Sequence, residues 1–337
     1  MKLTRRLTCS LAFLFHCFCI SHWVDAQVSF DTEHSFFIEI PFDTSGVFEG
    51  QEKPFGGISA ITYSGHESDY YLLSDGLPAR YYTFSIDPIK SLSIVYKDVY
   101  YLAESQIRGE GMALSGSSMF VSDERDIDNV EKTLVWQADA SGKLQNIKDL
   151  PVRYYGEMYD NSGFEGLTIS PDHKKLFLAM ERALPTSGCR SILPILEYSL
   201  ADHSTKTYWY QMQWNTKGNG ISSLVALSDY ELLVIERDYL KAEDRNEVNI
   251  YKITLIEASK NNDSDCPQSG EPVLVPEKIF SFSRDLKLGG QPYKVNNIEG
   301  ATFTPDGQYL LLVSDNNFGN KGNRTPTQLV ALKVTKF

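Results

Sequence analysis

Short apolar stretches alternate with polar turns along the chain, and one arrangement of them recurs five times. Each unit begins with a glycine-containing segment and a short apolar strand, then passes through a turn into a second apolar strand that ends in an acidic residue. The units open at 57–61, 109–113, 164–168, 220–224 and 298–302. Their second strands end at 72–75, 120–125, 178–182, 233–237 and 312–316. A repeat of short strands with a period of roughly 50 to 60 residues is typical of a β-propeller.

The strand count predicts an all-β propeller of five four-stranded blades. The first four units each supply four strands, whereas the fifth supplies only three, at 301–304, 309–314 and 329–334. The strand-like segment 34–41 provides the missing fourth strand, so that the N-terminal segment closes the ring and removes its open edges. A sixth blade hidden around 126–130 or 241–247 is the alternative.

The first 26 residues have the pattern of a secretory signal. Basic residues at 2, 5 and 6 precede an apolar stretch at 7–20 and the small-residue site Val24-Asp25-Ala26. We therefore predict a single domain over 27–337 in a secreted or periplasmic protein, with a retained membrane anchor as the alternative. Of five cysteines, only Cys189 and Cys266 lie outside this segment, and their spacing leaves open whether they form a disulfide. The net charge of −12 disfavours nucleic acid and anionic membranes as partners and favours cations.

Three glutamates are the sharpest candidates for chemistry, because each stands directly before a glycine at the start of an innermost strand. They are Glu110, Glu165 and Glu299, and Ser59 and Ser222 occupy the matching position in the other two units. Carboxylates gathered at one axis repel each other unless protons or a cation neutralise them. Ca²⁺ prefers oxygen ligands and is the predicted cofactor. The alternative is structural: the glutamates cap backbone amides or pair with arginines between blades.

A second constellation lies at the ends of the second strands. It consists of Asp75, Asp123, Glu124, Glu181, Glu236 and Asp315, and three copies continue into Arg125, Arg182 and Arg237. In one interpretation the acids bind a metal and the arginines bind an anionic substrate group. In the other, Glu–Arg pairs join the blades. The candidate metal ligands are accordingly Asp75, Glu110, Asp123, Glu165, Glu299 and Asp315, with Glu110, Glu165 and Glu299 as catalytic candidates and the three arginines as substrate-binding candidates.

Other chemistries have little support in the sequence. There is no Gly-x-Ser-x-Gly motif, and the four histidines beyond residue 26 lie outside the repeated motifs. No glycine-rich phosphate-binding loop precedes a helix pattern.

The repeated motifs resemble one known family. The segments 108–112, 163–167 and 297–301, each with a central Glu-Gly, together with Val121-Ser122-Asp123-Glu124-Arg125 and Val313-Ser314-Asp315-Asn316, are similar to the phytase-like family described as having esterase-like activity of phytase. The similarity spans about residues 56 to 334. It implies an exported propeller, a phosphoesterase or esterase activity, and calcium by similarity to propeller phytases.

Three functions follow from these observations. The first is a Ca²⁺-dependent phosphoesterase that acts on a small anionic ester at the central channel, where the metal polarises a phosphoryl oxygen and activates a water. The second is a non-enzymatic propeller that binds a glycan, a peptide or a partner protein. The third is a lactonase-type propeller that hydrolyses carbon esters with Ca²⁺ and a carboxylate base.

Overall fold

The computed structural model of the chain is an all-β ring of small antiparallel sheets. It describes residues 27–40, 55–88, 92–102, 107–123, 135–139, 143–147, 150–151, 163–213, 218–260, 264–288, 290–318 and 325–336. The candidate Arg125 and its neighbour Glu124 lie outside these residues, as does the predicted signal at 1–26. Export and signal removal therefore stay predictions. No helix within the described residues is long and apolar enough to cross a membrane.

Five sheets form the blades, in agreement with the predicted count. The first blade contains β2 (Ile58–Tyr63), β3 (Asp69–Ser74), β4 (Arg80–Asp87) and β5 (Ser93–Tyr101). The second contains β6 (Gly109–Ser115), β7 (Ser118–Asp123), β8 (Val135–Ala138) and β9 (Leu144–Asn146). The third contains β10 (Phe164–Ile169), β11 (Lys175–Met180), β12 (Ile192–Ser199), β13 (Thr205–Gln211) and the short β17 (Val273–Leu274).

The last two blades involve the C-terminal half and the N-terminal strand. The fourth contains β14 (Gly220–Ala226), β15 (Glu231–Leu240), β16 (Arg245–Thr254) and β18 (Glu277–Ser281). The fifth contains β21 (Asn297–Phe303), β22 (Tyr309–Asp315), β23 (Thr327–Lys336) and β1 (Ser29–Ile40). Between them lie the one-turn helix α2 (Phe282–Asp285) and a hairpin of β19 (Lys287–Leu288) and β20 (Gln291–Pro292).

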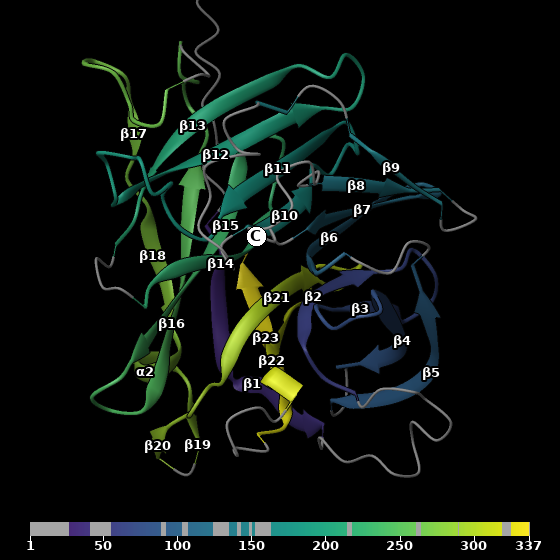
Figure 1. The fold of residues 1–337 in the computed structure, drawn as a ribbon. Coiled ribbons are helices and arrows are strands. Elements are labelled where there is room, and N and C mark those ends of the chain that lie inside the picture. Colours follow the sequence, from purple (N-terminus) through teal and green to yellow (C-terminus); the bar gives the residue numbers. More distant parts are fainter. Residues whose placement is uncertain are drawn as a thin grey trace, which may run out of the picture.

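The innermost strands form a ring around a central axis. β2 contacts β6, β6 contacts β10, β10 contacts β14, β14 contacts β21, and β21 returns to β2. Figure 1 shows these five strands around the centre of the molecule, with outer strands such as β5 and β9 at the periphery. β1 closes the ring by pairing antiparallel with β23, where Phe37 lies opposite Val330 and Ile38 opposite Leu329. The predicted closure by the N-terminal strand is therefore confirmed.

Five separate apolar clusters hold the ring together, one at each junction between neighbouring blades. Successive residues of a strand point to opposite faces of its sheet. In β22, Leu310 and Leu312 pack toward the fourth blade, whereas Leu311 and Val313 pack toward the first. Strands buried on both faces explain why the second strand of each unit is an uninterrupted apolar run.

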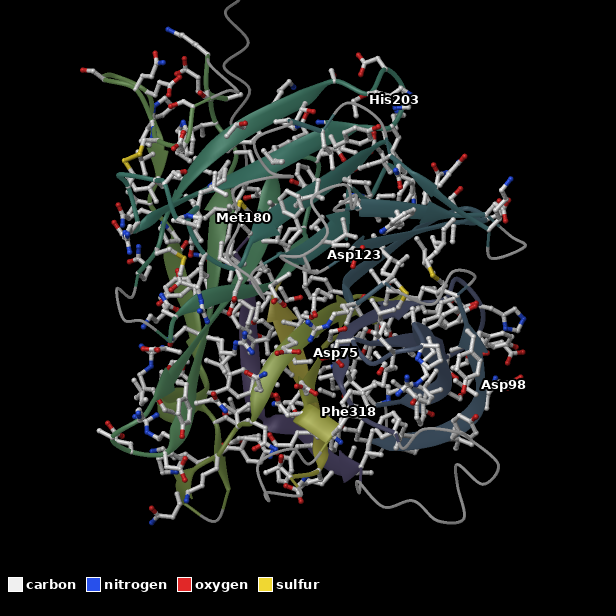
Figure 2. All side chains as sticks on the ribbon, viewed as in Figure 1. Asp75, Asp98, Asp123, Met180, His203 and Phe318 are labelled. Atoms are coloured by element: carbon white, nitrogen blue, oxygen red, sulfur yellow. A yellow bond between two sulfur atoms is a disulfide. The ribbon has the colours of Figure 1, made fainter. Side chains whose placement is uncertain are left out.

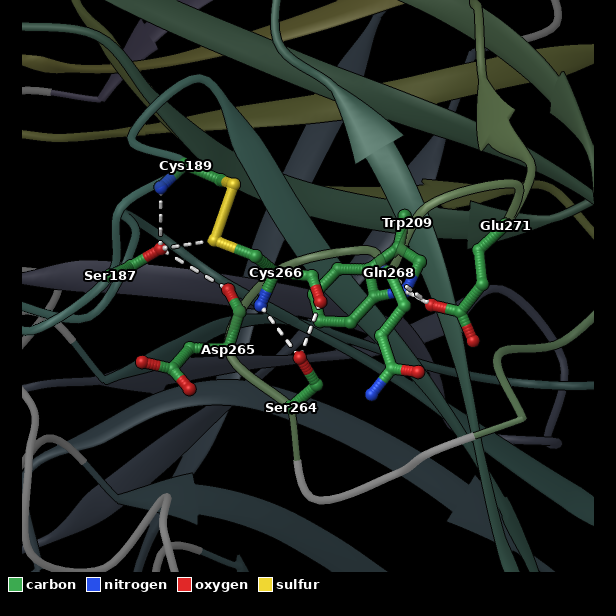
Figure 3. The surroundings of a disulfide bond; sticks show 8 residues. All are labelled: Ser187, Cys189, Trp209, Ser264, Asp265, Cys266, Gln268 and Glu271. Atoms are coloured by element: carbon green, nitrogen blue, oxygen red, sulfur yellow. Dashed lines mark hydrogen bonds between the residues drawn. A yellow bond between two sulfur atoms is a disulfide. The ribbon is translucent and has the colours of Figure 1, made fainter.

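A disulfide fixes the polar insertion that follows β16. Cys189 and Cys266 are bonded, with their Cα atoms 5.6 Å apart, which settles the pairing that the sequence left open. The Ser187 hydroxyl donates to the carbonyl of Asp265 at 3.1 Å beside the bridge, and the Trp209 indole donates to Glu271 at 3.2 Å (Figure 3). The chain then returns as β17, which pairs parallel with β13 and adds a fifth strand to the third blade.

Candidate functional site

A β-bulge occurs at the same place in all five inner strands. The strand register shifts between residues 58 and 60, 109 and 112, 164 and 166, 221 and 223, and 298 and 300. The residues passed over are Ser59, Glu110 with Gly111, Glu165, Ser222 and Glu299. A bulge leaves its extra residue outside the ladder and redirects its side chain. The structure thus makes the predicted trio of glutamates and its two serine counterparts equivalent around the axis.

The glycine after each bulge glutamate allows neighbouring inner strands to approach closely. A Cβ on Gly300 would lie 2.7 Å from the backbone nitrogen of Ile61 in the first blade. A Cβ on Gly166 would lie 2.7 Å from Cγ of Leu224 in the fourth. Only a hydrogen atom fits where a side chain would begin at these positions. The packing at the axis therefore explains why a glycine follows each of these glutamates.

Arg237, at the end of β15, joins three blades through carboxylates. Its Nη1 donates to Oε1 of Glu299 in the fifth blade at 2.6 Å, and its Nη2 donates to Oε1 of Glu181 in the third at 3.1 Å. Nη1 also donates to Oδ1 of Asn297. The three side chains are largely buried: Arg237 is 12 % exposed, Glu299 11 % and Glu181 4 %. Arg237 therefore matches the interpretation in which Glu–Arg pairs join blades.

The acids around Arg237 outnumber its single positive charge. Burial raises the pKa of Glu299 well above its ordinary value, and the charge of Asp315 raises it further, while Arg237 opposes both. Glu165 and Asp75 also raise the pKa of Glu299. Burial raises the pKa of Asp315 to about 6, against the opposing effects of the backbone N–H of Asn317 and of Arg237. We call this group the axial cluster; its members are Asp75, Glu165, Glu181, Arg237, Glu299 and Asp315.

Two serines complete the ring of bulge positions and differ in their contacts. The Ser59 hydroxyl donates to the carbonyl of Gly109 at 2.6 Å and so joins the first two blades. Ser222 is fully buried on β14, between the strands that carry Glu165 and Glu299. Its Oγ has no hydrogen-bond partner within the described part of the chain. A buried hydroxyl in this state is suited to hold a water or a substrate oxygen.

The remaining candidates have other surroundings. Asp123 accepts hydrogen bonds from the backbone of Arg108 at 3.1 Å and from the Trp136 indole at 3.0 Å, which ties it to its own blade. Glu110 is buried at the bulge of β6. Arg182 is 43 % exposed and donates to Glu181 at 3.0 Å. Figure 2 shows Asp75, Asp123 and Met180 in the inner part of the ring, and Asp98 and His203 at its rim.

Glu236 is the acid that best fits a purely structural role. Its Oε1 accepts hydrogen bonds from the Tyr210 hydroxyl at 2.6 Å and from the Gln213 backbone at 3.1 Å. These contacts join β15 to the third blade. The acids at the ends of the second strands therefore include a residue with scaffold contacts, Glu236, as well as members of the axial cluster.

Calcium stays a prediction, because no group of ligands for it is found among the described side chains. Hard carboxylate oxygens are the ligands that Ca²⁺ prefers. Within the residues that the structure describes, however, no three His, Cys, Asp or Glu side chains are grouped so that they could hold a metal ion. The guanidinium of Arg237 instead supplies the positive charge between Glu181 and Glu299.

Comparison with known proteins gives a family and two distant structures. Residues 53–318 match the phytase-like family, described as "Esterase-like activity of phytase". No curated protein matches the chain. An endo-arabinase from Bacteroides thetaiotaomicron VPI-5482 is similar with 12 % identity and a TM-score of 0.47, over 87 % of this chain and 96 % of that one. The extracellular domain of a hybrid two-component system from B. thetaiotaomicron has 13 % identity and a TM-score of 0.36, over 83 % and 28 % of the two chains.

Proposed function

The chain belongs to the phytase-like family, and we propose that it hydrolyses esters at the axial cluster, with buried carboxyl groups transferring the protons. The observation that carries the proposal is the excess of acids over the single Arg237 in a buried site. Burial and mutual repulsion raise the pKa values of acids in such an arrangement, which favours retention of a proton by some of them. A pair of carboxyls with unequal pKa values is what general acid–base catalysis requires.

The pair that fits this role is Asp315 and Glu299. Asp315, whose pKa is raised to about 6, would take a proton from the attacking water. The water oxygen bonds to the ester carbon, and the bond from that carbon to the alcohol oxygen breaks. Glu299, whose pKa is raised, would give its proton to the departing alcohol oxygen. An acid and an alcohol leave, and solvent returns the two carboxyls to their starting states.

The surrounding residues support these roles by position. Arg237 and Asn297 both donate to Oε1 of Glu299, so Oε2 remains for the transferred proton. Ser222 Oγ, on the neighbouring inner strand, would hold the attacking water. Because the cluster carries more acids than bases, it favours an uncharged carboxylic ester over a phosphate ester, whose negative charge it would repel.

The test is a panel of carboxylic and phosphate esters assayed with the chain from residue 27, with and without a chelator. Glu299→Gln and Asp315→Asn are each expected to lower kcat by about 100-fold or more while the protein stays folded. Asp98→Asn, an exposed aspartate on β5, is the matched control and keeps full activity. Hydrolysis that survives in both variants would remove these carboxyls from the reaction. A ligand bound without turnover would favour the binding propeller.

The assay in the presence of a chelator distinguishes hydrolysis by proton transfer alone from the predicted calcium-dependent hydrolysis. If protons and Arg237 balance the charge of the cluster, activity persists in the chelator. Activity that is lost in the chelator and restored by Ca²⁺ would favour a metal-dependent hydrolase, as the family resemblance implies, and would reopen phosphate esters as substrates.

A further inference from the structure

A cavity of about 450 Å³ lies beside the axial cluster, between the fourth and fifth blades. The β15–β16 hairpin lines one side through Tyr239 and Asn246, and the ends of β21 and β22 line the other through Asn297 and Asp315. Its volume is within the range of small-molecule sites. Because Asn297 and Asp315 belong to both the cavity wall and the surroundings of Glu299, a ligand in the cavity would reach the proposed reaction centre.

Asparagine is the most frequent residue on the wall. Asn246, Asn296, Asn297, Asn316 and Asn317 all line the cavity. The side chains of Asn246 and Asn317 make no hydrogen bond within the described part of the chain, and the buried Nδ2 of Asn316 has no partner there. Each amide offers both donors and an acceptor, which matches hydroxyl groups that also donate and accept.

An exposed aromatic ring stands at the same wall. Tyr239 is 47 % exposed, and its hydroxyl donates to Asp244 at 2.6 Å. This hydrogen bond orients the ring at the cavity, where it offers an apolar face. A ring face beside amide groups suits a molecule that has apolar C–H faces and hydroxyl edges.

The charged residues at the wall are largely neutralised. Arg245 is paired with Glu243 and Glu247, and Asp244 accepts the Tyr239 hydroxyl. Lys294 is exposed and has no ion-pair partner within the described residues, but Asp315 opposes it on the same wall. The wall therefore lacks the cluster of unpaired cationic side chains that an anionic ligand would need.

We propose that this cavity binds a neutral carbohydrate, which forms the alcohol part of the ester that the axial cluster hydrolyses. The second half of this inference rests on the proposed function, whereas carbohydrate binding does not. The first test is therefore direct binding to the chain from residue 27, measured by saturation-transfer NMR and calorimetry. Methyl xyloside, methyl glucoside and cellobiose are the probes, and trialanine tests a peptide ligand in place of a sugar.

Two substitutions at the cavity and one matched control assign the site. Tyr239→Ala and Asn246→Ala are each expected to weaken binding of the responding sugar about tenfold. Tyr100→Ala is the control, because Tyr100 is also 47 % exposed but lies on β5 of the first blade; it leaves binding unchanged. Absence of sugar binding, binding of trialanine alone, or equal loss in the control would overturn the proposal.

Ester hydrolysis then tests whether the bound carbohydrate is the alcohol part of the substrate. The wild type is expected to cleave acetylated methyl xyloside with a higher kcat/KM than nitrophenyl acetate, and Tyr239→Ala is expected to narrow that difference. Hydrolysis without sugar binding would reject the carbohydrate site and keep the esterase. Sugar binding without hydrolysis would keep the site and reject the esterase.

Discussion

Arg237 in the fourth blade and Glu299 in the fifth are held 2.6 Å apart, between Nη1 and Oε1, where the inner strands meet. The same guanidinium reaches Glu181 in the third blade. Burial lowers the pKa of Arg237, but the charges of Glu299, Glu181 and Glu165 outweigh it and raise the pKa above its ordinary value. One side chain thus connects three of the five blades and holds a proposed proton donor in place.

Replacement of this arginine tests how much the connection stabilises the ring. Arg237→Gln leaves the buried Glu181 carboxylate without its cation and removes the hydrogen bond to Glu299, so the free energy of unfolding is expected to fall by about 3 to 5 kcal/mol. Urea unfolding followed by tryptophan fluorescence measures the change. Arg182→Gln is the control: Arg182 contacts the same Glu181 but is 43 % exposed, and its loss is expected to cost about 1 kcal/mol or less. Equal costs would contradict the central role of Arg237.

Asp315 predicts a pH dependence of stability. Its pKa is raised from an ordinary value of 3.8 to about 6, so the folded state holds the proton more tightly than the unfolded chain. The stabilising contribution of the protonated group is full below pH 3.8 and is lost as the pH rises toward 6. Across this window the wild type is expected to lose about 2 to 3 kcal/mol more than Asp315→Asn. Urea unfolding at several pH values measures both proteins.

A second aspartate provides the control for that comparison. The pKa of Asp202 is lowered to about 2 by a hydrogen bond with Ser199 and by further hydrogen bonds with Ser204, so Asp202 titrates below the window. Asp202→Asn should therefore keep the wild-type slope. A slope that is also unchanged in Asp315→Asn would show that Asp315 does not hold its proton in the folded state.

The close approach of inner strands predicts that a side chain at position 300, in place of Gly300, destabilises the ring. In Gly300→Ala the new Cβ would lie 2.7 Å from the nitrogen of Ile61 and 2.8 Å from the carbonyl carbon of Ala60. The blades would have to separate, and the free energy of unfolding is expected to fall by about 1 to 3 kcal/mol. In the matched Gly188→Ala the Cβ would lie 3.9 Å from Sγ of Cys266, and a change within about 0.5 kcal/mol is expected. Thermal and urea unfolding of both variants decide the point.

The disulfide predicts a redox-dependent stability. Cys189 and Cys266 are 77 residues apart in sequence, and their bond restricts the unfolded chain. Reduction of the wild type is expected to lower the free energy of unfolding by about 2 to 4 kcal/mol. The double variant Cys189→Ser/Cys266→Ser should match the reduced protein and should not respond to the reductant. Free thiols in non-reduced peptides, detected by mass spectrometry, would contradict the pairing.

The blades could be predicted from the sequence because each second strand is apolar on both faces, as in Leu310 to Val313, and because glycines mark the crowded inner strands. The equivalence of Glu110, Glu165 and Glu299 followed from the same repeat. The contacts of Arg237 could not be predicted, since they depend on where a long side chain points between three sheets. The hydrogen bonds from Trp136 to Asp123 and from Asn297 to Glu299 could not be predicted either. Neither Trp136 nor Asn297 belongs to a pattern that is repeated in all five units.

The pairing of β1 with β23 has a consequence for biosynthesis. β1 is made before every other strand that the structure describes, yet its partner at 327–336 is made last. A chain that is released early leaves β1 and β22 as open edges, and open edges pair with other chains. Synthesis of β23 therefore decides between a sealed ring and an aggregating fragment. Because pairing across such a sequence separation is slow, the last blade is expected to set the rate at which the domain matures.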